Sequence, residues 1–193
     1  MVCIRQRVHW LIVIALSAVL PVPAQAGAIA FDQFLEFGFD GVAFATGCAP
    51  NDPGGSFCPP SSGTSTSFLD TPPWTFTAPS QGAVLTVTDA FLAGDRFQVF
   101  DSGADLGLTS APSGNADCGD DPVPCLADPN ISKRSFSLAA GDHAITIYSV
   151  LASSGSGYLR VTAIPEPSSL LFIALGGVAA LLGVRRRRSA TGS

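Results

Sequence analysis

Two apolar segments at opposite ends of the chain confine any folded domain to the residues between them. The chain has 193 residues, and the stretch from Gly27 to Ile164 leaves roughly 140 for folding, enough for one domain with its own core and too few for two. We therefore expect a leader over residues 1–26, one domain over residues 27–163 and a C-terminal signal over residues 164–189.

The N-terminal segment has the three parts of a secretory signal peptide. A basic stretch from Met1 to Arg7 precedes the apolar run from Val8 to Leu20, and Ala24 and Ala26 then stand before Gly27. Small residues at such positions fit signal peptidase, which we expect to cleave between Ala26 and Gly27. An uncleaved anchor is the alternative, but the apolar run is short for crossing a membrane.

The C-terminal segment joins a proline-flanked acid, an apolar stretch and a block of positive charge. Pro165, Glu166 and Pro167 come first, residues 168–184 follow, and the block consists of Arg185, Arg186, Arg187 and Arg188. As a helix, residues 168–184 would measure about 26 Å, just enough for a thin membrane. The arginines would stop transfer and stay in the cytoplasm, and the prolines would keep the tripeptide extended outside.

This ordered set of elements resembles the PEP-CTERM sorting signal. The resemblance implies a Gram-negative host and recognition by exosortase, a membrane protease-transpeptidase. It also implies an exported precursor held transiently in the inner membrane, then delivered to the cell surface or the extracellular matrix. The expected partners are therefore exosortase and the inner membrane, together with the signal peptidase that the leader implies. An exopolysaccharide is a further expected partner. The resemblance covers only the tail and does not assign a role to the domain.

The charge of the middle is strongly negative. The middle contains fourteen acidic residues and four basic ones, which gives a net charge of −10. The basic residues are Arg96, Lys133, Arg134 and Arg160. Phosphate backbones are bound by basic patches, so nucleic acid is not an expected partner.

Four cysteines remain once the leader is removed, which in an exported domain predicts two disulfides. Three pairings are possible, and the spacing favours Cys48 with Cys58 and Cys118 with Cys125. Zinc is the rival interpretation, but neither gap has the spacing of a zinc-binding pair. We therefore expect no metal site and no cofactor.

Alternation of large and polar residues recurs along the middle and predicts short strands. Residues 143–151 and 158–163, separated by a Ser- and Gly-rich stretch, are expected to form a hairpin with a long turn. The predicted strands are Trp74–Thr77, Ala83–Thr88, Arg96–Phe100, Arg134–Leu138, His143–Leu151 and Tyr158–Ala163. Early phenylalanines are expected in the core, namely Phe31, Phe34, Phe37, Phe39 and Phe44.

Short strands with Gly and Pro turns and no helical stretch predict an all-β domain. We expect an antiparallel β-sandwich, with a jelly roll as one form of it. A signal helix would precede this domain, and a transmembrane helix would follow it. Residues 88–157 also resemble, loosely, a recurrent extracellular domain of PEP-CTERM proteins, to which no activity is attached.

Candidate sites are few. Acidic residues near the second cysteine pair could bind Ca²⁺ or form turns, namely Asp117, Asp120, Asp121 and Asp128.

His143 is the one histidine of the middle and begins a predicted strand, where we expect it to have a structural role. No nucleophile motif accompanies it. We assign no catalytic residue.

The sequence therefore predicts a non-enzymatic extracellular module with a structural or carbohydrate-associated role. A secreted glycan-active hydrolase and a Ca²⁺-dependent adhesion module are the alternatives.

Overall fold

A computed structural model of the chain describes residues 27–49, 58–151 and 154–166. The predicted signal peptide, the apolar stretch 168–184 and the four terminal arginines lie outside the described residues. Within the described ranges, no helix has the length and apolar character needed to cross a membrane.

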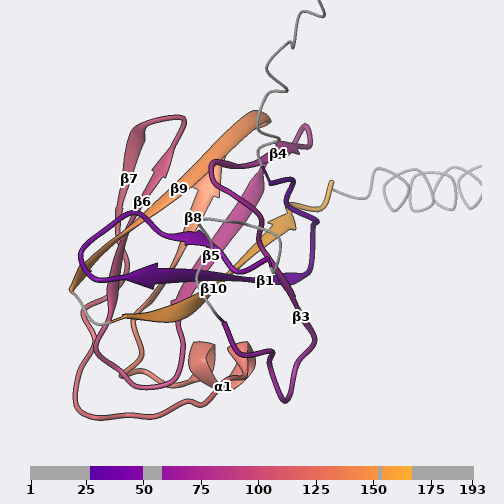
Figure 1. The fold of residues 1–193 in the computed structure, drawn as a ribbon. Coiled ribbons are helices and arrows are strands. Elements are labelled where there is room, and N and C mark those ends of the chain that lie inside the picture. The colour runs from indigo at the N-terminus through magenta and orange to yellow at the C-terminus, as the bar shows by residue number, and fades with distance from the viewer. Residues whose placement is uncertain (1–26, 50–57, 152–153, 167–193) are drawn as a thin grey trace, which may run out of the picture.

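Strands form two sheets, which confirms the all-β class (Figure 1). One sheet has the order β2-β1-β10-β5-β8, and β3 joins the same edge of β1 as β2. Its strands are β1 (Phe34–Asp40), β2 (Thr46–Gly47), β3 (Thr66–Phe68), β5 (Ala83–Asp89), β8 (Lys133–Leu138) and β10 (Ser154–Ala163). The other sheet has the order β4-β9-β6-β7. Its strands are β4 (Trp74–Ala78), β6 (Arg96–Asp101), β7 (Ala104–Leu108) and β9 (Gly141–Leu151). All pairs are antiparallel except β1 with β3.

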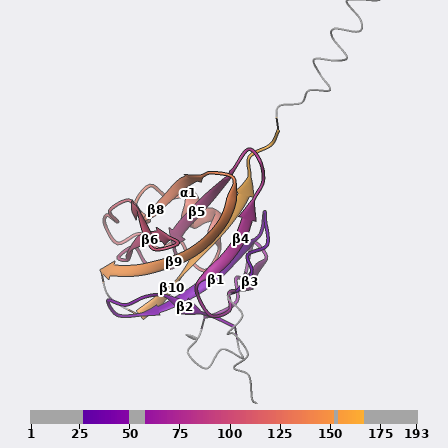
Figure 2. The same ribbon diagram turned by 90° about the horizontal axis from the view of Figure 1, so that it is seen from above.

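The core lies between the two sheets, where β9 and β4 pass over β10 and β1 (Figure 2). Phe37 of β1 meets Trp74 of β4 at a ring-centroid distance of 5.9 Å and Phe97 of β6 at 5.3 Å. Phe39 also meets Phe97, at 5.3 Å. Because alternate residues of a strand point to opposite faces, β9 and β10 also bury apolar side chains here, namely Ile145, Ile147, Leu159 and Val161.

The predicted hairpin between the last two strands is wrong. β9 pairs with β4 and β6, whereas β10 lies in the other sheet between β1 and β5. β10 also begins at Ser154, so the predicted loop supplies four strand residues. Gly155 and Gly157 allow this, because the rings of Phe39 and Phe37 occupy the space where their side chains would lie.

One short helix, α1 (Pro122–Ala127), was not expected from the sequence. The Asp121 carboxylate accepts a hydrogen bond from the Val123 amide at 3.0 Å, and Pro122 starts the first turn. An acidic cap followed by proline is a common helix start. This pair was therefore the available signal for α1.

We predict that Gly157→Ala destabilises the domain by roughly 2–3 kcal/mol, through overpacking. A Cβ at residue 157 would lie 2.5 Å from the ring of Phe37 and 2.9 Å from the carbonyl oxygen of Thr88. The measurement is the urea midpoint of unfolding. Gly94→Ala is the matched control, since a Cβ there meets nothing within 4 Å, and it should shift stability by less than about 0.5 kcal/mol. Equal midpoints for the two variants would contradict the role given to Gly157.

Candidate functional site

The tail begins where the last strand ends. The Ile164 amide donates to the carbonyl oxygen of Gly82 at 3.1 Å, which continues the pairing of β10 past Ala163. Pro165 and Glu166 are exposed, and the Ser80 hydroxyl donates to the Glu166 carboxylate at 2.9 Å. The first two residues of the tripeptide thus stand at the edge of the domain, beside the turn between β4 and β5. Pro167 lies outside the described residues.

Three aromatic rings form a cluster on the outer face of the four-stranded sheet; we call Phe44, Phe100 and Tyr148 the aromatic cluster. Phe44 meets Tyr148 edge-on at 5.1 Å and Phe100 at 6.1 Å between ring centroids. Phe44 was expected in the core and is instead 57 % exposed. It forms an isolated antiparallel bridge with Tyr148 of β9, which places its ring on this outer face.

Polar groups flank the aromatic cluster. Gln98 lies opposite Tyr148 in the sheet, and Asp105 lies opposite Phe100. The Gln98 side-chain amide donates to the Asp105 carboxylate at 2.7 Å. One exposed and two half-buried rings bordered by an amide and a carboxylate give this face both apolar contact area and directed hydrogen-bonding groups.

His143 lines a shallow hollow of about 400 Å³ at the β4–β9 edge, together with Phe76, Thr77 and Asp142. Its Nδ1 lies 2.7 Å from the Asp101 carboxylate, and its Nε2 lies 3.0 Å from the carbonyl oxygen of Ala139. Burial lowers the pKa of His143, but the hydrogen bonds to Asp101 and Ala139 outweigh it, and the net shift is upward. Both partner atoms are acceptors, and this environment favours the imidazolium form, in which both ring nitrogens donate.

The contacts to Asp101 and Ala139 leave neither ring nitrogen of His143 free to activate a nucleophile. A histidine activates a hydroxyl only through a free, unprotonated nitrogen. The Phe76 ring stacks on the His143 ring at a centroid distance of 5.0 Å. The Asp101 carboxylate also accepts a hydrogen bond from the Ala144 amide at 3.1 Å. The contacts of His143 therefore tie β4, β6 and β9 together.

The acidic residues named from the sequence accept hydrogen bonds within turns or between neighbouring loops. Asp117 accepts from Gly119, Asp120 from Ser62, Asp121 from Val123 and Asp128 from Asn130, at 2.6 to 3.1 Å. Asp117, Asp121 and Asp128 accept from a residue two positions along the chain, the geometry of turn formation. The structure therefore assigns each of these carboxylates a structural partner.

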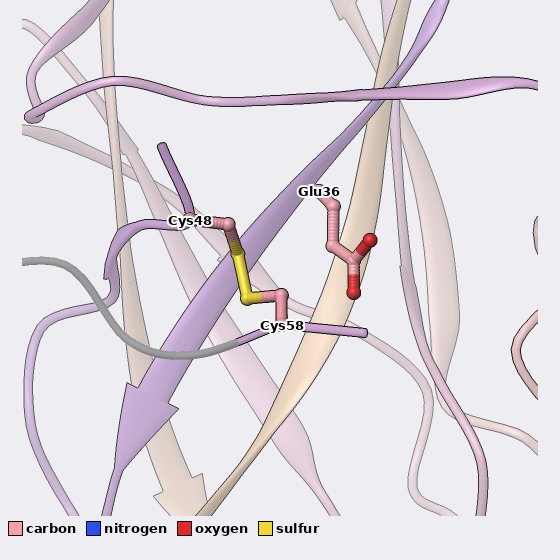
Figure 3. Close-up of side chains that lie close together, drawn as sticks. All are labelled: Glu36, Cys48 and Cys58. Atoms are coloured by element: carbon pink, nitrogen blue, oxygen red, sulfur yellow. A yellow bond between two sulfur atoms is a disulfide. The ribbon is translucent and has the colours of Figure 1, made fainter. Parts of the chain in front are cut away.

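The cysteines pair as the spacing predicts. Cys48 and Cys58 are joined with a Cα–Cα distance of 5.6 Å, and Cys118 and Cys125 with one of 4.9 Å. The first pair lies against a side chain that the sequence reasoning missed, Glu36 of β1 (Figure 3). A Glu36 carboxylate oxygen and both sulfur atoms lie within 4.8 Å of one another. Because both sulfurs are held in the disulfide, the group offers no thiolate to a metal ion.

Glu36 is fully buried, and its two carboxylate oxygens accept no hydrogen bond of ordinary geometry within the described ranges. Burial raises the pKa of Glu36 to about 7; the nearby Ser156 hydroxyl lowers it and the charge of Asp120 raises it further. Asp89 of β5 is also fully buried, and burial, aided by the charge of Asp95, raises its pKa to about 8. Burial therefore brings the pKa values of two carboxyl groups of the folded domain to near neutral pH.

The described residues define an all-β protein of two packed sheets, tied by two disulfides, whose last strand leads directly into an acidic, proline-flanked tail. Residues 163–188 match the family model of the PEP-CTERM protein-sorting motif, so the chain carries the sorting signal that its tail predicts. This motif is the signal that exosortase recognises, and it marks the chain as an exported, exosortase-sorted protein. No curated protein and no solved structure gives a significant match to the chain.

We predict that the domain loses stability as the pH rises from 5 to 8. The folded-state pKa of Glu36 is about 7 against 4.5 for the free group, so in this interval the folded state binds more protons than the unfolded state. The free energy of unfolding then falls with pH, by about 2.5 kcal/mol between pH 5 and pH 8 for Glu36 alone; Asp89 acts in the same direction. The measurement is the melting temperature of the full-length chain at several pH values.

Glu36→Gln should flatten this pH dependence, because the amide cannot ionise. Glu166→Gln is the matched control, since Glu166 is exposed, and its profile should follow that of the unmodified chain. A Glu36→Gln profile as steep as that of the unmodified chain would contradict the prediction.

Proposed function

We propose that this protein is a non-enzymatic component of the extracellular matrix whose domain binds a neutral polysaccharide through the aromatic cluster, after export and processing by exosortase. The observation that carries the proposal is the exposure of the Phe44 ring beside Tyr148 and Phe100 on a sheet face. We also infer that the two sheets form a β-sandwich, of which a jelly roll is one form.

The chemistry of the aromatic cluster suits a sugar chain. The faces of pyranose rings carry C–H groups, which pack on aromatic rings, and sugar hydroxyls need hydrogen-bond partners at the rim of such a site. Gln98 and Asp105 stand next to the rings and provide a side-chain amide and a carboxylate. An exposed ring packed against two half-buried rings leaves apolar surface in contact with water, which is common at binding surfaces.

The charge of the domain narrows the class of polysaccharide. Fourteen acidic residues against four basic ones give the middle a net charge of −10. Like charges repel an anionic polymer at low ionic strength. A neutral chain, such as a glucan, is therefore the expected ligand.

The geometry around His143 supports a binding role over hydrolysis. Asp142 is the one carboxylate lining the described hollow, whereas glycoside hydrolysis uses two facing carboxyl groups. A glycan-active hydrolase remains the alternative, and release of reducing sugar from a neutral glucan would favour it. Calcium-dependent adhesion is the third candidate, and a calcium-dependent rise in melting temperature would favour that role.

We predict that Phe44→Ala and Tyr148→Ala each weaken binding to a neutral glucan roughly 10-fold, which corresponds to about 1.4 kcal/mol of lost ring contact. The measurement is the retardation of the full-length chain, purified in detergent, during electrophoresis through gels containing the glucan. Leu92→Ala is the control because Leu92 is an equally exposed apolar residue outside the aromatic cluster. Unchanged retardation of both aromatic variants would contradict glycan binding by this face.

We predict that the mature protein ends before Arg185 only in cells with an active exosortase, because that enzyme acts at the Pro165–Pro167 motif. The measurement is mass spectrometry of the C-terminal peptides from cells with and without exosortase. The same intact tail in both cell types would contradict processing by this route, whatever the glucan measurements show.

A further inference from the structure

Glu36 and the first disulfide form one buried group on the outer face of the six-stranded sheet. Glu36 is 0 %, Cys48 5 % and Cys58 4 % exposed, and Figure 3 shows the Glu36 side chain lying alongside the disulfide. The backbone fixes this arrangement through Leu69, whose amide donates to the backbone carbonyl oxygen of Glu36 at 3.0 Å and whose own carbonyl oxygen accepts from the Cys48 amide at 2.9 Å. The carboxylate and the sulfur atoms therefore stay close while the sheet is intact.

The surroundings of Glu36 favour its protonated form. Its oxygens and the Ser156 hydroxyl lack partners of ordinary hydrogen-bond geometry within the described part of the chain, and an unpaired buried charge is costly. The titratable groups that face it are Asp120, ahead of α1, and Tyr158, which lies directly opposite Glu36 on β10. Asp120 adds negative charge, and the Tyr158 hydroxyl is already committed to the Asp120 carbonyl oxygen at 2.6 Å.

We propose that Glu36 is the acid–base partner of the Cys48–Cys58 disulfide: its carboxylate takes the proton of a buried thiol when the bond forms and returns it when the bond is broken. Proton transfer needs hydrogen-bond reach or one intervening water molecule, and a separation within 4.8 Å fits transfer through one water molecule. This inference does not depend on glycan binding or on the processing of the tail.

Each step balances with an external disulfide as the oxidant. One cysteine first loses its proton to solvent, and its thiolate attacks the external disulfide: a mixed disulfide forms, the S–S bond of the reagent breaks, and one half of the reagent leaves as a thiolate with the electron pair. The other thiol gives its proton to the Glu36 carboxylate, and its thiolate attacks the cysteine sulfur of the mixed disulfide. The Cys48–Cys58 bond forms, the bond to the reagent breaks, and the reagent leaves as a thiolate with the electron pair. Reduction by an external thiolate reverses these steps, and the Glu36 carboxyl group protonates the sulfur that leaves.

The second disulfide provides an internal comparison. Both sulfurs of Cys118 and Cys125 lie near the carbonyl oxygen of Gly119, at 3.7 and 3.6 Å. A backbone carbonyl does not exchange protons near neutral pH. Within the described ranges, no carboxylate forms a comparable group with this pair. Its opening should therefore lack the pH dependence of the first disulfide.

The test is the rate of opening of each disulfide by dithiothreitol between pH 5.5 and 8.5, in the full-length chain purified in detergent. Alkylation followed by mass spectrometry separates the two pairs, and rates are divided by the concentration of dithiothreitol thiolate. For Cys48–Cys58 we expect this rate constant to fall at least tenfold as pH rises, with a midpoint near pH 7, because the pKa of Glu36 is about 7 and only the protonated acid assists the leaving sulfur.

In Glu36→Gln, the rate constant for opening of Cys48–Cys58 should be low at every pH and show no midpoint. The rate constant for Cys118–Cys125 should not depend on pH in either protein. Glu36→Asp retains a carboxyl group on a shorter side chain and should retain a weaker midpoint, which tests the proposal independently of the glutamine variant. If Glu36 had only a structural role, the rate constant should instead rise with pH, because the domain loses stability as pH rises and the disulfide would then open faster. A flat profile in the unmodified chain, or the same midpoint in Glu36→Gln, would overturn the proposal.

Discussion

Contacts between the phenylalanine rings of β1 and the rings of the facing sheet set the position of the rest of the domain. Phe37 meets Trp74 and Phe97, and Phe39 meets Phe97. These rings fit only because β10 places glycine beneath them, at Gly155 and Gly157. One strand supplies the large residues and its neighbour supplies the space, so the two must pair in this register for the core to close.

That pairing has consequences on the other face of β1. When Phe37 points inward, Glu36 must point outward, and there its carboxylate lies against the disulfide between Cys48 and Cys58. The result is a buried carboxyl group beside a disulfide, with no hydrogen-bond donor of ordinary geometry among the described residues. The same strand register that completes the core therefore creates the most unusual chemical environment described in the domain.

The sequence predicted the local features and missed those set by distant segments. Alternation located β4, β5, β6 and β8, because the period of a strand is visible in a few residues. It could not show that β9 and β10 separate into different sheets, since partners for β9 come from residues 74–78 and 96–101. Distant segments also explain two residues. Phe44 was wrongly expected in the core, because its exposure depends on its position beside β9. Glu36 was overlooked, because its burial depends on a disulfide.

The position of β10 also bears on how the domain resists a pull through its tail. β10 lies between β1 and β5, and the chain continues from Ala163 to the sorting motif with no intervening spacer. Tension applied through the tail would act along this inner strand, so its hydrogen bonds to both neighbours would be loaded together in shear. An edge strand would have hydrogen bonds to one neighbour only. The tail is thus attached to a strand whose hydrogen bonds on both sides would resist the pull.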